Sequence, residues 1–473
     1  MRIICIILCI ASLSPITSSS SPYYSRSHHH HNSESYSYLC LVLGLCSGSS
    51  NSHYSGDKLT TVYQWKYLNY AYDSAQQMQT DYRTGNLVPR KPAPIDVDVY
   101  YDRRFGHQKV FVTSPRFQAG VPAALGMVVL DRNGEPYVKP YPSWGWHENP
   151  ARCNRDRIVS VYRIEIDECD RLWVLDNGQL DENVICPPQL LVFDLRNDRL
   201  IHRYEIPRDQ YQIDSTFVTP IVEVKSRANS CRNTFVYAAD CVANSILVYD
   251  MSKEKSWVFK HSSMYPDPDW ANYHIAGESF DIMDGVLGMA LSPALSKEGR
   301  KLYYHAMSSD TEHWVYTKDL QNQTATENAQ IFNTYTGRRG TQSAAEAVDS
   351  DGILYFGLMS EIDVACFDTR GKYGRNCPST DIVARNNDTL QFISGMKVVR
   401  NPRGVEELWL LSSRFQKVAN DNIRNNEYNF RIMKGNVEEL KKGTKCQRGG
   451  YPGKETTARG AGPVIFPDNN RKR

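Results

Sequence analysis

Several acidic residues and one arginine stand at the ends of strand-like runs, and their types suit proton transfer and amine binding. Asp176 and Asp240 close two such runs, Glu346 begins another, and Arg116 follows a fourth. A carboxylate whose pKa is raised by burial can act as a general base, while a guanidinium can hold an anionic group. We therefore take Glu346 and Asp240 as candidate catalytic residues, with Arg116 and Asp176 as candidate ligand-binding residues.

Two phenylalanines complete this set. An aromatic amine or a catechol needs a flat apolar surface for its ring and an anion for its ammonium group. Phe280 and Phe392 lie in segments that lead into strand-like runs. We predict that they form this surface beside Asp240 or Glu346, so that the ligand is a small aromatic amine or a catechol-derived molecule.

Each of these residues also has a purely structural interpretation. An Asp directly after a strand commonly caps a turn through its own backbone, which applies to Asp176 and Asp240. The phenylalanines are of the kind found more often in a core than at a rim, and Arg116 can hold a loop carboxylate instead of a ligand. The residues alone leave both interpretations open.

The sequence favours neither a metal nor a cofactor, so we predict none. It has no C-x-x-C pair, and no H-E-x-x-H, P-loop or dinucleotide-binding motif stands in a suitable structural context. Six histidines are scattered through different segments without ligand spacing: His147, His202, His261, His274, His305 and His313.

The elements that must position these residues form an internal repeat. Six short apolar runs each follow a polar turn, and they begin at residues 109, 172, 234, 302, 353 and 408. Other strand-like runs lie before and after them, such as residues 159–166, 189–194 and 201–206. Four strands per unit predict the blade of a β-propeller, so the fold class is all-β with six blades.

The two ends of the chain together supply the last strand that the six units need. The sixth unit lacks an outer strand, while residues 61–70 form an unassigned alternating segment before the first unit. We predict that this N-terminal strand joins the last blade and closes the ring, because an open ring would leave sheet edges exposed. The alternative is an array of β-sandwiches with irregular spacing.

Composition limits the partners. The 473 residues are 41% hydrophobic and 23% charged, with a formal net charge of +2, as in an ordinary folded protein. Because this charge provides no basic field, we expect no nucleic acid partner. The sequence does not indicate an oligomeric state.

The N-terminal region predicts export. Arg2 and the apolar run at residues 3–13 are typical of a signal peptide, although a second short run at residues 39–46 leaves the mature start open. Neither run is long enough to span a membrane. We divide the chain into a leader at residues 1–56, the propeller at residues 57–446 and a flexible tail at residues 447–473, and expect a secreted, extracellular protein.

Cysteines and glycosylation motifs agree with export. Eight cysteines lie beyond the leader, a number that favours disulfides in a secreted chain. Cys169 and Cys231 fall in equivalent turns of successive units, so we predict a disulfide between them. Asn322 and Asn387 begin N-x-T motifs and are candidate glycosylation sites.

The motifs together resemble the Yellow and major royal jelly protein family of insects, over about residues 60–446. The resemblance is carried by Ser114–Pro122, Asp167–Gly178, Cys186–Asp194, Tyr237–Cys241 and Gly285–Pro293.

This resemblance implies a secreted six-bladed propeller with a role in cuticle pigmentation or melanisation. It implies a protein that binds or converts catechol-derived indoles such as dopachrome, which requires a base and an acid for proton transfer. Two alternatives remain: a binder of biogenic amines without catalysis, and a structural or nutritive secreted protein.

Overall fold

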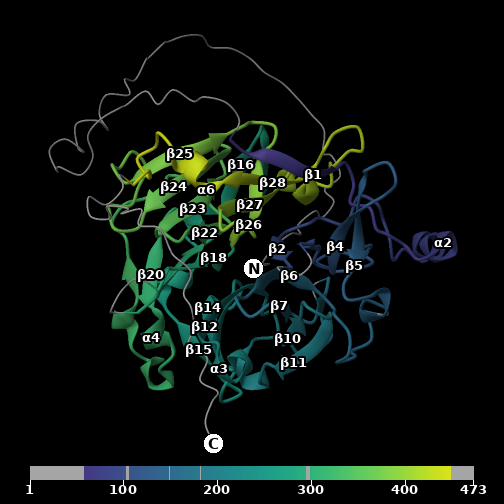
Figure 1. Cartoon of the computed structure of the whole chain (residues 1–473), viewed down its shortest axis with the longest axis horizontal. Helices are drawn as coiled ribbons and strands as arrows, with labels where there is room; N and C mark the ends of the chain where they lie inside the picture. Colours follow the sequence, from purple (N-terminus) through teal and green to yellow (C-terminus); the bar gives the residue numbers. More distant parts are fainter. Residues whose placement is uncertain (1–57, 103–105, 149, 182, 295–298, 449–473) are drawn as a thin grey trace, which may run out of the picture.

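The computed structural model describes residues 58–102, 106–148, 150–181, 183–294 and 299–448, and these form a closed ring of β-sheets. Within them, six antiparallel sheets of four strands each surround a common axis (Figure 1). The prediction of an all-β, six-bladed β-propeller is confirmed. We number the blades 1 to 6 in chain order. The innermost strand of each blade begins at what we call the upper rim and ends at the lower rim.

The strands of the first three blades follow one another directly in the sequence. Blade 1 consists of β2 (Val97–Tyr101), β3 (Gln108–Thr113), β4 (Leu125–Leu130) and β5 (Pro136–Pro140). Blade 2 consists of β6 (Val161–Ile166), β7 (Arg171–Asp176), β10 (Gln189–Asp194) and β11 (Arg199–Glu205). Blade 3 consists of β12 (Phe217–Ser226), β13 (Asn233–Asp240), β14 (Ser245–Asp250) and β15 (Lys255–Lys260).

The remaining blades repeat the pattern, except that the last takes one strand from the start of the chain. Blade 4 consists of β18 (Val286–Leu291), β19 (Lys301–Ala306), β20 (His313–Tyr316) and β21 (Asn333–Thr334). Blade 5 consists of β22 (Glu346–Val348), β23 (Ile353–Leu358), β24 (Asp363–Asp368) and β25 (Thr380–Arg385). Blade 6 consists of β26 (Phe392–Arg400), β27 (Glu406–Ser413), β28 (Phe430–Asn436) and β1 (Thr60–Trp65).

The six apolar runs of the sequence are the second strands of the six blades. Both faces of these strands are covered by neighbouring blades, so every residue of β7 and all but the first residue of β13 are buried. This double burial explains why the runs are continuously apolar instead of alternating, and why they could be found by inspection.

The N-terminal strand closes the ring as predicted. β1 pairs antiparallel with β28, from Thr60 opposite Lys434 to Trp65 opposite Phe430. Trp65 is buried, and its Nε1 donates a hydrogen bond of 2.8 Å to the carbonyl of Pro136 in blade 1. The strand therefore covers the edge of blade 6 and also attaches it to blade 1.

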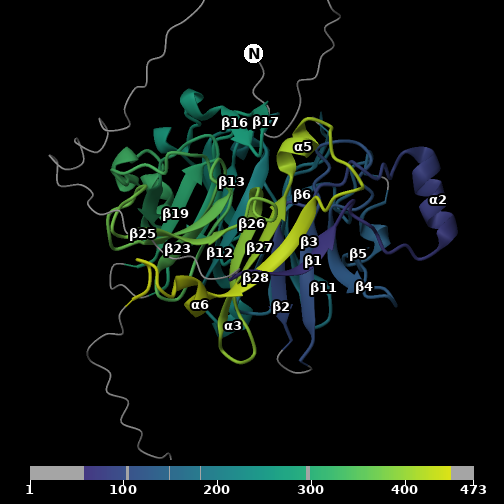
Figure 2. The same cartoon turned by 90° about the horizontal axis from the view of Figure 1, so that it is seen from above.

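Short helices and hairpins lie in the segments between and after the strands of the blades. Figure 2 shows the hairpin of β16 and β17 and helix α5 on one side of the ring, with α3 and α6 on the other. The helices are α2 (Ala75–Thr84), α3 (Ala228–Cys231), α4 (Thr317–Leu320), α5 (Phe415–Ala419) and α6 (Val437–Lys441). The hairpins are β8 (Gln179–Leu180) with β9 (Asn183–Val184), and β16 (Asn272–Ile275) with β17 (Glu278–Asp281). Short 3₁₀ helices are Trp144–Trp146, Arg208–Gln210, Ser262–Met264, Pro268–Trp270, Gln323–Ala325 and Ala329–Ile331.

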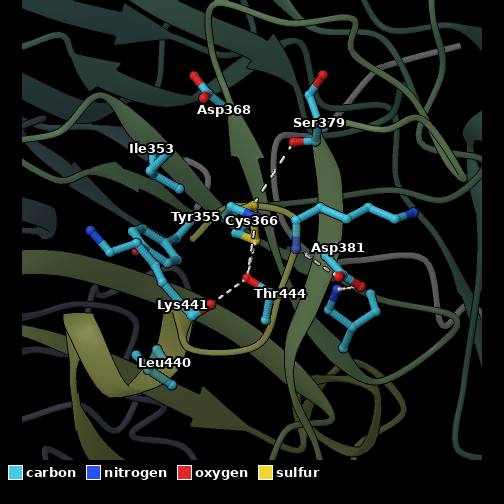
Figure 3. The surroundings of a disulfide bond; sticks show 12 residues. Ile353, Tyr355, Cys366, Asp368, Ser379, Asp381, Leu440, Lys441 and Thr444 are labelled. Atoms are coloured by element: carbon cyan, nitrogen blue, oxygen red, sulfur yellow. Dashed lines mark hydrogen bonds between the residues drawn. A yellow bond between two sulfur atoms is a disulfide. The ribbon is translucent and has the colours of Figure 1, made fainter. Parts of the chain in front are cut away.

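Three disulfides join described residues. The predicted Cys169–Cys231 bridge is present and links the lower turns of blades 2 and 3. The others are Cys153–Cys186 and Cys366–Cys446. The last one anchors the segment after α6 to β24, where Thr444 and Lys441 lie close to it (Figure 3).

Predictions about the ends of the chain fall mostly outside the described residues. This applies to the leader at residues 1–56 and to nearly all of the tail at residues 447–473. Asn322 and Asn387 are both exposed, as a glycosylation site requires, and their modification stays a prediction. In the described part of the chain, no helix has the length and apolar character needed to cross a membrane.

The closing strand generates a stability prediction. Replacing Trp65 with Ala should lower the free energy of unfolding by about 3–5 kcal/mol, because a large buried side chain is lost. Urea unfolding followed by fluorescence or circular dichroism measures the change. Thr60→Ala on the same strand is the control, since Thr60 is exposed and its change should stay within about 0.5 kcal/mol. Equal stability of the two variants would contradict the closure described here.

Candidate functional site

One arginine crosses the axis of the ring. Arg163 lies on β6 and is buried, and its guanidinium donates four hydrogen bonds to residues of other blades. The acceptors are Thr219 Oγ1 at 2.6 Å and the carbonyls of Leu287 at 3.0 Å, Ala344 at 3.1 Å and Ser394 at 2.7 Å. One charged group therefore links blades 2 to 6 and separates the upper part of the axis from the lower part.

A second charged group lies nearer the lower rim. Lys397 of β26 contacts Glu165 at 2.6 Å and Asp96 at 3.9 Å. Asp96 and Asp98 each accept a backbone hydrogen bond from β6, from Ile164 at 3.1 Å and Ile166 at 2.8 Å. Burial raises the pKa of Glu165, which Lys397 opposes. These contacts hold β2, β6 and β26 together.

The upper rim carries a cluster of aromatic rings. The ring centroid of Phe415 in α5 lies 5.7 Å from that of Phe280 in β17 and 4.7 Å from that of Phe392 in β26. Tyr273 stacks on Phe280 at 4.9 Å. The two phenylalanines predicted from the sequence are thus brought together, although Phe280 is only 8% exposed and Phe392 only 4%. Their contacts are also those of a packed core, which was the structural alternative.

A buried carboxylate lies close to this cluster. Asp284 precedes β18 and is fully buried. Burial and the charge of Asp284 together raise the pKa of Tyr162. Tyr273 also has a raised pKa, through burial first and then Asp284, while a hydrogen bond with Ser308 opposes the shift. The Tyr273 hydroxyl and the Asp284 amide both contact Ser308 Oγ, at 2.9 and 3.0 Å, so Asp284 lies beside the ring that stacks on Phe280.

Asp176 and Asp240 are both engaged by backbone groups. Asp176 accepts hydrogen bonds from the amides of Val159, Ser160 and Gly178 at 2.9–3.1 Å. Asp240 accepts two bonds of 3.0 Å through Oδ1, from the amides of Thr216 and Ala243. Burial raises the pKa of both carboxyls, and the hydrogen bonds oppose this. Both residues have the turn-capping contacts of the structural alternative, and contact with a ligand stays a prediction.

Arg116 is likewise bound to backbone groups of the protein. Its guanidinium donates to five backbone carbonyls at 2.6–3.2 Å, which occupy all five of its N–H groups. The acceptors are Val121, Pro122, His147, Ile158 and Val159. In this arrangement the guanidinium holds loops of blades 1 and 2 together, and its donors are not directed at a ligand.

Glu346 belongs to a buried cluster between blades 4 and 5. Its Oε2 lies 3.1 Å from His305 Nδ1, which also lies 3.1 Å from Glu312 Oε2. Arg339 Nη1 donates to Glu312 Oε2 at 2.8 Å. Burial, followed by the charge of Glu346, raises the pKa of Glu312 to about 7. One donor atom from each of His305, Glu312 and Glu346 lies within 4.8 Å of the others, a set that could hold a metal ion.

Sequence reasoning missed Arg163, Asp284, His305 and Glu312. Arg163 had a signal, since it and Glu165 are charged residues inside an otherwise apolar inner strand, and such charges must find partners when they are buried. His305 similarly ends an apolar run. Glu312 had no sequence signal, because it meets its partners only across the interface between two blades.

The fold and these contacts define a closed six-bladed β-propeller with an arginine across its axis and aromatic rings with buried carboxylates at one rim. A family model described as "Major royal jelly protein" matches residues 159–446. The chain therefore belongs to the Yellow and major royal jelly protein family, as the resemblance implied.

Individual relatives cover most of the chain. Major royal jelly protein 9 of Apis mellifera is 37% identical over 398 residues, which are 81% of this chain and 89% of the relative. Dopaminechrome tautomerase of Drosophila melanogaster is 33% identical over 403 residues, which are 83% of this chain and 85% of the relative. A solved streptogramin B lyase aligns with a TM-score of 0.37 at 11% identity, covering 74% of this chain and 95% of its own.

The position of Arg163 generates a second stability prediction. Arg163→Met should lower the free energy of unfolding by at least about 3 kcal/mol, because it removes the donor that binds the buried carbonyls of Ala344 and Ser394. Urea unfolding measures the loss. Arg232→Met is the control, since the Arg232 side chain is 52% exposed and its ion pair contributes at most about 1 kcal/mol. A loss at Arg163 no larger than the control would show that the axial contacts are unimportant for stability.

His147, which packs beside Arg116, generates a pH prediction. Burial and then Arg116 lower its pKa to about 3, so it stays neutral in the folded protein while it becomes charged in the unfolded chain below about pH 6.5. The unfolded state then binds more protons, and stability is lost as the pH falls. Between pH 7 and 5, the native protein should lose about 2 kcal/mol more than His147→Gln, measured by urea unfolding at both values. Equal losses would contradict a neutral His147.

Proposed function

We propose that the protein is secreted and acts in cuticle pigmentation or melanisation, by binding or converting a catechol-derived indole of the dopaminechrome type. The family membership and the relative named as a dopaminechrome tautomerase support the chemical class of the ligand. The three disulfides agree with an oxidising, extracellular compartment.

The observation that carries this proposal is the aromatic cluster beside a buried carboxylate at the upper rim. Phe280 and Phe392 both contact Phe415, and Asp284 shares a contact to Ser308 with Tyr273, which stacks on Phe280. Rings of this kind suit the face of an indole, while a carboxylate suits its positive nitrogen. The rings are packed closely, so a ligand enters only if side chains of the cluster move apart.

Conversion of such a ligand is an isomerisation. A carbon-bound proton is removed and a proton is returned at another atom, so no oxidant or reductant is consumed. Glu346 and Asp240 are the proposed bases. Both are buried at the upper rim, and in neither residue are both carboxylate oxygens bound to a cationic side chain. Asp240 Oδ2 has no hydrogen-bond partner among the described residues.

Binding without conversion is the second candidate. It is favoured by the full engagement of Asp176 and Arg116 with backbone groups, which leaves the proposed site with fewer groups for catalysis. It also agrees with the relative at 37% identity, whose name describes a royal jelly protein and no reaction. In this case the ligand is a biogenic amine held by the same rings.

A turnover assay separates the candidates. Purified protein should accelerate the loss of visible absorbance of dopaminechrome, and Glu346→Gln or Asp240→Asn should lower the rate by about 100-fold or more, the usual contribution of a general base. Calorimetry with dopamine and serotonin is run on the same samples. Heat of binding without turnover indicates the binder, and neither signal indicates a structural or nutritive protein.

Glu223→Gln is the matched control for these variants. Glu223 is also buried, but it lies toward the lower end of β12, bonded to Tyr237 at 2.7 Å and Gln321 at 2.9 Å. Its turnover should equal that of the native protein. Full turnover in both Glu346→Gln and Asp240→Asn would mean that the proposed bases are wrong even if the protein is an enzyme.

A further inference from the structure

Three side chains from two blades meet around one histidine at the upper rim. His305 is the penultimate residue of β19, Glu312 lies just before β20, and Glu346 begins β22. All three side chains are completely buried. The ring of His305 lies against Gly288 of the inner strand β18, where a Cβ atom would collide with it. The backbone therefore leaves room for this histidine in particular.

The described residues do not fill the hydrogen-bonding capacity of the two carboxylates. Glu346 Oε1 and Oε2 are buried and have no hydrogen-bond donor among the described residues, and the same is true of Glu312 Oε1. The other oxygen of Glu312 is held by Arg339 Nη1 at 2.8 Å. A buried carboxylate oxygen without a partner is costly, so these atoms indicate a missing positive group.

The hydrogen bonds of His305 orient its ring for ligation. Nε2 lies 3.1 Å from the carbonyl of Ser343, which can only accept, so Nε2 carries the proton. Nδ1 then faces the two glutamates. A histidine that donates one N–H to a backbone carbonyl while its other nitrogen meets carboxylates is the usual arrangement around a protein-bound metal.

The spacing also suits a metal. Nδ1 lies 3.1 Å from one oxygen of each glutamate. Two ligands that are each about 2.1 Å from an ion, at roughly a right angle, are about 3 Å apart. In this cluster two carboxylates meet one guanidinium, that of Arg339, so an added cation finds an excess of oxygen ligands.

We propose that His305 Nδ1, Glu312 and Glu346 bind a divalent transition-metal ion that joins blades 4 and 5. One nitrogen and two carboxylate ligands favour an ion such as Zn²⁺ or Co²⁺ over Mg²⁺ or Ca²⁺, which prefer oxygen alone. The three ligands lie 7 and 34 residues apart along the chain and come from two blades, so the sequence spacing showed no motif.

A cavity provides a route to this cluster. A space of about 190 Å³ is lined by Arg339 and Tyr373, together with residues of β23, β24 and β25. Arg339 Nη1 also bonds to the Tyr373 hydroxyl at 2.8 Å. Arg339, which also bonds to Glu312, is therefore the contact between this cavity and the proposed ligands.

Equilibrium dialysis of the full-length native protein against Zn²⁺, followed by elemental analysis, tests the proposal. The native chain should retain close to one ion per chain, and Co²⁺ should give the visible absorption bands of a low-symmetry site. Glu312→Gln and Glu346→Gln should each weaken binding by more than about 100-fold, since loss of an outer partner of a ligand alone costs about 10- to 100-fold. Glu223→Gln, a buried carboxylate of blade 3, should bind like the native chain.

Two results would overturn the proposal. The first is a native chain that retains no Zn²⁺ and shows no Co²⁺ bands, which would mean that a proton shared by His305 and the glutamates fills the place of the ion. The second is native-like binding in both glutamine variants. Because the native chain is tested directly, a variant that fails to fold does not decide the outcome.

This inference and the proposed function share Glu346, so the metal bears on which residue is the base. A metal that holds Glu346 removes it from proton transfer, so turnover would then depend on Asp240. Asp240→Asn therefore reports on catalysis, while Glu312→Gln reports on the metal. Loss of turnover without loss of Zn²⁺, or the reverse, distinguishes the failure of one proposal from the failure of the other.

Discussion

The need to satisfy one buried guanidinium constrains the whole ring. Arg163 lies where water cannot solvate it, so its charge is tolerable only if carbonyl or hydroxyl oxygens surround it. Those oxygens come from the inner strands of four other blades or the segments leading into them. Each inner strand must therefore stand at a similar distance from the axis, and a shift of one blade along its length would remove a bond from the shared centre.

This arginine also separates two chemically different halves of the molecule. Above it lie the rings of Phe280, Phe392 and Phe415, with Asp284 and the His305 cluster. Below it lies Lys397 with its carboxylates, near the rim that is tied by the Cys169–Cys231 disulfide. In the upper half, Oε1 of Glu312 and of Glu346 has no hydrogen-bond partner among the described residues. In the lower half, Lys397 is paired with Glu165 and Asp96.

The fold could be predicted from the sequence because each blade is a local unit. Its second strand is covered on both faces and appears as a continuous apolar run, and the missing outer strand of blade 6 pointed to the N-terminal segment. The site was less accessible. Phe280 and Phe392 meet through Phe415, whose helix carried no signal, and Glu346 meets His305 and Glu312 only across two blades. Contacts between blades depend on how the ring closes, and a local sequence pattern does not contain this information.

The same limit explains why Arg116, Asp176 and Asp240 had two interpretations. A charged residue at a strand end can face a ligand or satisfy backbone amides and carbonyls, and the sequence is the same in both cases. The structure shows that the backbone contacts of Arg116 use every N–H of its guanidinium. Those of Asp240 occupy one oxygen and leave the other buried. The difference arises from loop geometry and not from residue type.

The pairing of β1 with β28 has a consequence for how the chain is made. β1 is the first of the described strands to leave the ribosome, and its partner is among the last. Until β28 has been synthesised, β1 has no strand to pair with and blade 6 is incomplete, so the ring cannot close earlier. Pairing over such a sequence distance is slow compared with local hairpin formation. The nascent protein therefore passes through a stage with five partly assembled blades. At this stage its exposed strand edges can associate with other chains, and it depends most on chaperones.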